Sequence, residues 1–174
     1  MKKLFFVLFV FFVGCYSNFD IYTVKDKYAS CKIYSTNDVI LQRETPIDRC
    51  GMSLRFISYS TDTVNTFMYV IYSGDQFAFL NGIKLRIGEK IIKPKTLEFK
   101  IDKDGLDNKQ EHLVVLLPEE LLTSMYKQLN TSMLIIGNNR NFEYSLSNLT
   151  IKKIYRFHTF IKNKVIQDDK KYLE

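Results

Sequence analysis

The alternation of hydrophobic and polar residues predicts that most of the first two thirds of the chain forms β-strands. Short apolar or alternating runs follow one another, with polar turn residues between them. The run 112–117 (HLVVLL) is apolar after its first residue, which is typical of a central strand buried on both faces. The other predicted strands are residues 30–34, 39–43, 52–59, 66–72, 76–80, 83–87, 90–92 and 96–101.

Two of the connections between these strands carry hairpin signals. Asn81-Gly82 lies between two alternating apolar runs, and Asn-Gly is favoured in type I′ turns because both turn residues adopt positive φ angles. Gly88-Glu89 precedes the short run 90–92 in a similar way. We therefore expect three successive antiparallel strands, with one tight turn at each dipeptide.

Helical periodicity follows in two later segments. Pro118, Glu119 and Glu120 suit a first helical turn, where Pro loses no hydrogen bond and carboxylates meet the positive end of the helix dipole. Asn130 can close this helix, and strands are predicted at 133–136 and 141–146. The apolar stripe of the first helix is Leu117, Leu121, Leu122, Met125, Tyr126 and Leu129; that of the second, predicted over 148–165, is Ile151, Ile154, Tyr155, His158, Ile161 and Val165.

These elements predict a single α+β domain, with a mainly antiparallel sheet or a small β-sandwich and about two helices toward the C-terminus. We place this domain at residues 29–166 and expect 167–174 to form a flexible tail. Of the 174 residues, 46% are hydrophobic, which is too many for a disordered chain. Only 7 Gly and 3 Pro are present, which excludes collagen-like and low-complexity chains.

The first fifteen residues have the pattern of an export signal. Lys2 and Lys3 precede the apolar run 4–13, and Gly14-Cys15 follows it. As a helix, this run would reach about 15 Å, half of a bilayer core of about 30 Å, so it is too short to span a membrane. A charged start, a short apolar run and a small residue before a cleavage point together predict a secretory signal peptide.

The end of this segment resembles the lipobox of bacterial lipoproteins. Val13, Gly14 and Cys15 fit the lipobox pattern, and Phe12 stands where Leu is usual. The resemblance implies cleavage after residues 1–14, a diacylglycerol thioether on Cys15, and an acylated amine carrying a chain such as palmitate. Several acyl chains give stable anchoring, so the resemblance implies attachment to a membrane of the bacterial cell envelope, at its periplasmic face or at the cell surface. The alternatives are an uncleaved N-terminal anchor and a buried core strand.

Cleavage would change the composition of the remaining chain. Residues 15–28 would form the lipidated N-terminus and a short tether, and the formal charge of +6 would fall to +4 with the loss of Lys2 and Lys3. Cys31 and Cys50 would then be the two remaining thiols. Outside the cytoplasm they are a candidate disulfide across a loop of about 20 residues, and the alternative is two free thiols in strands.

The basic residues suggest a membrane or protein partner rather than a nucleic acid, because an exported protein does not meet nucleic acids. On a helical wheel, one face of the last helix lies opposite its apolar stripe and carries four basic residues and one Phe. Such a face is a candidate contact with anionic lipid or an envelope protein partner. The alternative is a solvated face of a core-packed helix. The residues are Lys152, Lys153, Arg156, Phe160 and Lys164.

Catalytic and metal-binding motifs give no support for an enzyme. H-E-x-x-H, G-x-S-x-G, phosphate-binding and dinucleotide-binding patterns do not occur, so we predict no catalytic residue, metal site or cofactor. His112 and His158 fit ordinary buried or interface positions unless either one meets a thiol or a carboxylate. These observations favour a non-catalytic binding, adaptor or structural module. The alternatives are an envelope hydrolase with a site not visible in sequence, and a surface-exposed ligand-binding or adhesion factor.

Overall fold

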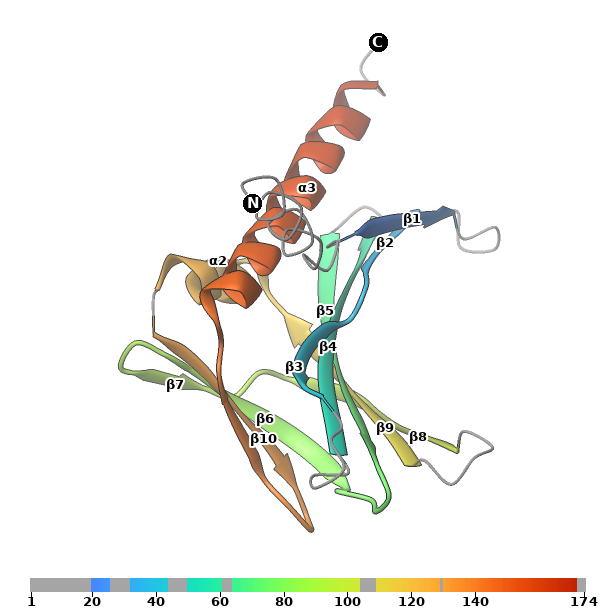
Figure 1. The fold of residues 1–174 in the computed structure, drawn as a ribbon. Coiled ribbons are helices and arrows are strands. Elements are labelled where there is room, and N and C mark those ends of the chain that lie inside the picture. Colours follow the sequence, from blue (N-terminus) through green and yellow to red (C-terminus); the bar gives the residue numbers. More distant parts are fainter. Residues whose placement is uncertain are drawn as a thin grey trace, which may run out of the picture.

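The computed structural model describes residues 20–25, 32–43, 50–60, 64–103, 109–128 and 130–171. Within these residues, nine strands are followed by a helix, a two-stranded hairpin and a second helix (Figure 1), which confirms the α+β class. The strands are β1 (Ile21–Lys25), β2 (Lys32–Thr36), β3 (Val39–Gln42), β4 (Cys50–Ser60), β5 (Val64–Gly74), β6 (Leu80–Ile87), β7 (Lys90–Ile92), β8 (Thr96–Lys103), β9 (Lys109–Leu117), β10 (Thr131–Gly137) and β11 (Phe142–Ser145). The helices are α2 (Glu119–Lys127) and α3 (Asn148–Lys171).

The larger of the two sheets has the strand order β1-β2-β4-β5-β9-β8, and all of its neighbouring strands are antiparallel. Its middle is formed by β4 and β5, which have 11 residues each. Met52, Leu54 and Phe56 are buried and alternate along β4 with less buried residues, so one face of the sheet turns toward the core. The strand β9 lies between β5 and β8, as its apolar sequence predicts.

The N-terminal strands differ from the expected arrangement. Tyr34 of β2 pairs with Ser58, and Val39 of β3 pairs with Leu54, so the two strands follow one another along the same edge of β4. The polar segment between β2 and β3 therefore joins two strands that both pair with β4, and these two strands do not form a hairpin with each other. The strand β1 pairs with β2, so part of the expected tether 15–28 belongs to the sheet.

The smaller sheet has the order β11-β10-β6-β7, and it corrects one prediction. The hairpin expected at Asn81-Gly82 is wrong, because both residues lie inside β6, where Gly82 pairs with Ile136 of β10 and Asn81 lies at an irregularity in this pairing. The backbone N–H groups of residues 78–80, which precede this point, donate to the carboxylate of Glu111 on β9. This partner is distant in sequence and overrides the local turn signal. The second expected hairpin is confirmed, with Gly88 at φ +60° between β6 and β7.

The hydrophobic core lies between the inner face of the larger sheet, the smaller sheet and the two helices. Phe157 of α3 packs against Phe56 of β4, with ring centroids 6.0 Å apart, and Tyr72 of β5 packs against Phe142 of β11 at 5.6 Å. Figure 1 shows both helices grouped at one end of the two sheets. The core therefore fixes the position of α3 against α2.

The two helices follow most of the predicted stripes, but Leu117 belongs to β9, and Tyr155, predicted on the apolar stripe of the second helix, is 51% exposed. Leu121, Leu122 and Met125 of α2 are buried, as expected. The end of α2 is bound by Thr131, whose hydroxyl donates to the Met125 carbonyl at 3.1 Å, instead of by Asn130. The helix α3 continues to Lys171, so it takes in most of the segment expected to be a tail. Backbone hydrogen bonds within a helix do not require burial, which explains how α3 can extend past the core.

A candidate functional site between the two helices

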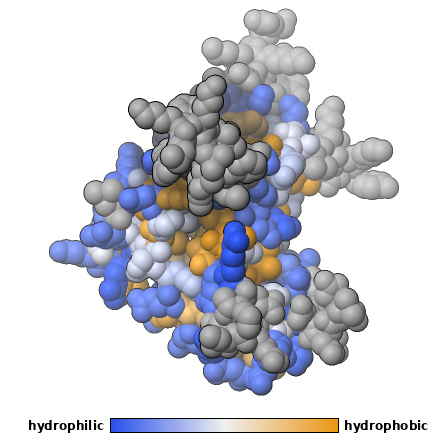
Figure 2. All heavy atoms as spheres, in the orientation of Figure 1, coloured by the Kyte–Doolittle hydropathy of each residue, from blue (hydrophilic) through white to orange (hydrophobic). Residues whose placement is uncertain are grey.

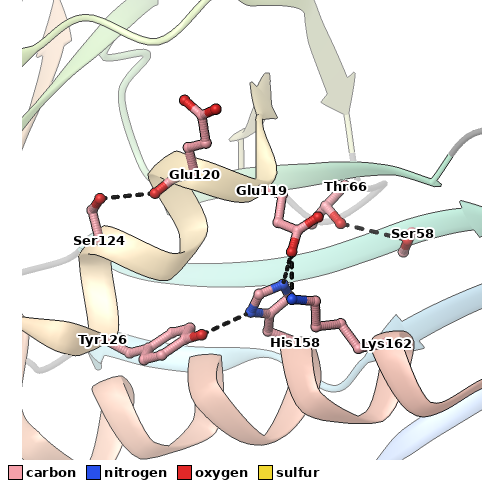
Figure 3. A network of polar contacts seen from close by, with 8 residues as sticks. All are labelled: Ser58, Thr66, Glu119, Glu120, Ser124, Tyr126, His158 and Lys162. Atoms are coloured by element: carbon pink, nitrogen blue, oxygen red, sulfur yellow. Dashed lines mark hydrogen bonds and ion pairs between the residues drawn. The ribbon is translucent and has the colours of Figure 1, made fainter.

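Four polar side chains from α2 and α3 meet where the helices cross (Figure 3). The hydroxyl of Tyr126 lies 3.1 Å from Nδ1 of His158, and Nε2 of the same ring lies 3.6 Å from Oε1 of Glu119. Nζ of Lys162 lies 2.6 Å from that same carboxylate oxygen. The result is a continuous row of a phenol, an imidazole, a carboxylate and an ammonium group.

Helical spacing explains why these residues converge. Glu119 and Tyr126 are seven positions apart, about two turns, so they lie on the same side of α2. His158 and Lys162 are four positions apart and are neighbours on α3. The core packing that holds the helices together therefore also aligns the two pairs.

Burial sets the protonation state of the imidazole. His158 is only 5% exposed, and burial lowers its pKa from the ordinary 6.5, an effect that Glu119 opposes and Lys162 reinforces. The ring is therefore mainly neutral at pH 7. The phenol of Tyr126 can then donate to Nδ1, which leaves the ring proton on Nε2, directed at Glu119. At 3.6 Å, that second contact is electrostatic and too long for a hydrogen bond.

The carboxylate end of the row is exposed to solvent. The side chains of Glu119 and Lys162 are 62% and 56% exposed. The hydrogen bond from Lys162 lowers the pKa of Glu119, and the same bond raises the pKa of Lys162. Both groups are therefore charged over a wide pH range, and solvent weakens the attraction between them.

Chemically, the row has the order hydroxyl–imidazole–carboxylate that activates a nucleophile in serine hydrolases, with a phenol in place of the Ser hydroxyl. The Tyr126 ring packs edge-on against Tyr155, with centroids 5.2 Å apart, and the His158 ring lies 5.6 Å from it. Both contacts of the Tyr126 ring therefore help to pack α2 against α3. The expectation that His158 is an interface residue fits this arrangement, and its meeting with a carboxylate is the feature that a hydrolase would also need.

A separate cleft of about 380 Å³ lies on the other side of the α2 N-terminus, next to the 93–95 segment. Its floor is apolar and its rim carries Lys93, Lys95, Glu120 and Ser124. The cleft is open to solvent, and its volume lies at the lower end of the range of small-ligand sites. The apolar residues that line it are Ile92, Pro94, Leu116, Pro118 and Leu121.

The lipidation and disulfide candidates are only partly within the described chain. Cys15 and Cys31 lie outside the described residues. Cys50 is the first residue of β4, and its backbone pairs with Gly74 of β5. The lipidation of Cys15 and the bridge between Cys31 and Cys50 therefore remain predictions.

The basic face of α3 is smaller than the helical wheel suggests. Lys152 and Arg156 are exposed, as expected. Lys153 is only 8% exposed, so its expected place on the solvent face is wrong. Phe160 is partly covered, because its ring meets Tyr34 of β2 edge-on at 5.7 Å. The α3 helix contacts the larger sheet on a side that the wheel assigned to solvent, since the wheel does not show where a sheet lies.

The Lys164 ammonium lies 5.9 Å from the centre of the Phe160 ring. A cation at this distance over a ring face is weakly attracted by it. Lys164 therefore remains beside Phe160, as the wheel predicts. The exposed residues Lys152 and Arg156 therefore remain candidates for the expected contact with lipid or a partner.

Glu111 is a buried carboxylate that the sequence analysis did not single out. It has no exposed surface, and its two carboxylate oxygens accept backbone N–H groups from Ala78, Phe79 and Leu80 at 2.5, 3.0 and 2.7 Å. Phe79 adopts a positive φ of 52° in this segment. The only signal in the sequence was an acid just before a fully apolar strand. Its role is to hold the start of β6.

No protein-family model matches the chain, and no curated protein sequence matches it. Among the residues that the structure describes, no three His, Cys, Asp or Glu side chains gather in a way that could hold a metal ion. Neither α2 nor α3 is long and apolar enough to cross a bilayer.

Figure 2 shows hydrophobic residues gathered near the middle of the face drawn, among hydrophilic ones. Over the described part of the chain, several large hydrophobic side chains are exposed, and single ones are normal on any surface. Several exposed hydrophobic side chains on one helix or strand are a better indication of a contact surface. The exposed set is Tyr22, Ile40, Phe79, Ile91, Leu97, Phe99, Ile101, Leu149 and Tyr155.

Proposed function

We propose that this chain is a lipid-anchored protein of the bacterial cell envelope, whose folded domain is a non-catalytic binding module. The observation that carries the anchor is the order of Lys2-Lys3, the apolar run 4–13 and Gly14-Cys15. Cys15 receives the lipid, and the β-rich domain lies at the membrane surface. Two or more acyl chains hold such a protein stably on a bilayer.

The cleft beside α2 supports the binding part of the proposal. Its apolar floor favours a ligand with a hydrocarbon or aromatic part, and Lys93 and Lys95 on its rim favour a negative group at one end. Glu120 is the only acid among the residues that line it. An amphipathic molecule with an acidic head, such as a fatty acid, is therefore the ligand class that this cleft suits.

Metabolic labelling with a palmitate analogue tests the anchor. The full chain should incorporate the label and remain with membranes, and Cys15→Ala should lose the label and leave an unprocessed or released protein. Cys31→Ala is the matched control, because it removes another thiol and should leave labelling unchanged. Equal labelling of the Cys15→Ala variant would contradict the proposal.

Photolabelling tests the cleft. Cells that produce the full chain are given a fatty acid with a photoreactive diazirine, and cross-linked peptides are mapped by mass spectrometry. We expect label on the peptides around residues 92–95 and 116–124. Ser124→Trp should fill the cleft and lower this labelling, whereas Thr123→Trp, on the adjacent residue of α2, should not. Labelling elsewhere, or labelling unaffected by Ser124→Trp, would remove this ligand class.

A second candidate, an envelope hydrolase, is favoured by one observation, the contact of His158 with both a hydroxyl and a carboxylate. Hydrolysis of p-nitrophenyl acetate by the full chain separates the two functions. The binding proposal expects the same rate from the native chain and from His158→Gln. A rate that falls at least tenfold in folded His158→Gln, and also in Tyr126→Phe, would favour the hydrolase.

A further inference from the structure

The strand β8 forms one edge of the larger sheet and carries a row of exposed apolar side chains. Within the described residues its ladder partner is β9, on one side only. Leu97, Phe99 and Ile101 are 44%, 39% and 43% exposed, so three of the exposed large hydrophobic side chains lie on this one strand. An edge strand with this composition can pair with a further strand, since its outer N–H and C=O groups have no ladder partner.

The register with β9 assigns the two faces of β8. Phe99 pairs with Leu113, so it lies on the inner face of the sheet. Glu98 pairs with Val114 and Lys100 pairs with His112, so both charges lie on the outer face. They already form an exposed ion pair at 3.3 Å. The edge therefore has apolar side chains on one face and one charge of each sign on the other.

We propose that a second copy of this chain pairs with β8 in antiparallel fashion, across a twofold axis through Phe99. This register places Phe99 opposite Phe99 of the partner subunit, and Glu98 opposite Lys100 of the partner subunit. Opposite charges and apolar pairs directly across a ladder stabilise it. The interface is isologous, so one patch supplies both sides.

Neighbouring registers are less favourable. Because side chains alternate between faces, a shift by one residue would place charges against apolar residues. If the twofold axis passed through Lys100, two Lys100 side chains would lie opposite each other. If it passed through Glu98, two Glu98 side chains would do so. Like charges directly opposite each other destabilise a strand pair. The strand also changes register between Thr96 and Glu98, so the regular edge begins at Glu98 and Leu97 lies outside it. The charge pattern therefore selects Phe99 as the centre.

The pairing is short, so association in dilute solution should be weak. Copies held on one membrane have a high effective concentration, which favours such a contact without any change in its geometry. This favourable setting rests on the proposed anchor. The pairing itself does not, because it depends only on residues of β8.

Cysteine cross-linking in the cells that produce the full chain tests the register. In a background with Cys31→Ser and Cys50→Ser, Phe99→Cys should give a disulfide-linked dimer, because directly opposite Cα atoms lie about 4.5–5.5 Å apart, within disulfide range. Ile91→Cys is the control, since Ile91 is 63% exposed on the edge strand β7 of the other sheet. Glu98→Cys and Lys100→Cys should each cross-link weakly alone and strongly when the two are produced together.

Charge reversal gives an independent test. Glu98→Lys should reduce the cross-linking of Phe99→Cys several-fold, because it places Lys opposite Lys, and Lys100→Glu should do the same. The double change Glu98→Lys with Lys100→Glu should restore it. All three sites are exposed, and unchanged thermal unfolding shows that each variant is folded.

Three results would overturn the proposal. The first is cross-linking of Phe99→Cys no stronger than that of Ile91→Cys, and the second is a double charge reversal that does not restore the dimer. A cross-link from Phe99→Cys to a different protein would also exclude the second copy as occupant and assign the edge to a foreign strand. Loss of lipid labelling with retained cross-linking would separate the failure of the anchor from that of the pairing.

Discussion

Glu111 and Glu119 are close in the sequence, yet they show two different uses of a carboxylate. Glu111 has no exposed surface and accepts three backbone N–H groups from the start of β6. Glu119 is 62% exposed and meets only side chains, those of Lys162 and His158. The first carboxylate determines where a strand begins, and the second joins two helices that the core already holds together.

The difference shows that the contribution of a carboxylate to stability depends more on its partners and its exposure to solvent than on its charge. A buried acceptor of backbone N–H groups cannot be replaced by water without a cost, because three donors would lose their partners. An exposed ion pair exchanges readily with water and salt. Glu111 should therefore control the stability of the domain, and Glu119 should have a small effect on it.

The largest expected effect tests this comparison directly. Glu111→Gln should lower the free energy of unfolding by about 3 kcal/mol, because an amide has one acceptor oxygen and turns its own N–H groups toward backbone donors. Urea unfolding of the full chain measures it. Glu98→Gln is the control, since this exposed acid lies on the neighbouring strand. A loss below about 1 kcal/mol would mean that water can take the place of the carboxylate.

The next effect concerns pH. His158 has a folded-state pKa below its ordinary 6.5, so the unfolded chain binds more protons around that pH. Stability should therefore rise with pH through this window and fall as the pH drops below 6.5, by at most about 1.4 kcal/mol for each pH unit. His158→Gln should remove this slope in unfolding curves between pH 5 and 7.5. A slope that persists in His158→Gln would assign it to another group.

The smallest effect completes the comparison. Glu119→Gln should change the free energy of unfolding by only about 0.5 kcal/mol at low salt, because an exposed pair contributes little and salt screens it. The loss of this carboxylate should also lower the pKa of His158 further, because Glu119 favours the protonated ring. NMR titration of the imidazole checks that shift. An effect as large as that of Glu111→Gln would reverse the comparison.

Much of the fold could be predicted from local pattern. The strands 52–59 and 66–72, the stripe of α2 and the turn at Gly88 follow from periodicity and backbone preference, which act over a few residues. The turn at Asn81-Gly82 could not be judged in this way. The conformation of this segment depends on Glu111 and on β10, which are distant in sequence, so no short window of sequence contains both.

For the candidate site, too, the sequence predicted the positions of some residues but not their contacts. The sequence places His158 on a helical stripe and Glu119 in a first turn, because both positions follow from spacing alone. That they meet, with Tyr126 and Lys162 beside them, depends on how α3 crosses α2. Lys153 is also buried, and Phe160 meets Tyr34 of the larger sheet, which a helical wheel drawn for an isolated helix cannot show.

By itself, the sequence determined the α+β class, the order of most elements and the expectation of a lipid on Cys15, since these depend on local periodicity and a contiguous motif. The tertiary structure alone decided which strands pair, what Glu111 holds, and that His158 lies between a phenol and a carboxylate. It also decided that β8, and no central strand, is left with an open edge beside Phe99. The reason is physical: hydrogen bonds and burial between distant residues form only when the whole core packs.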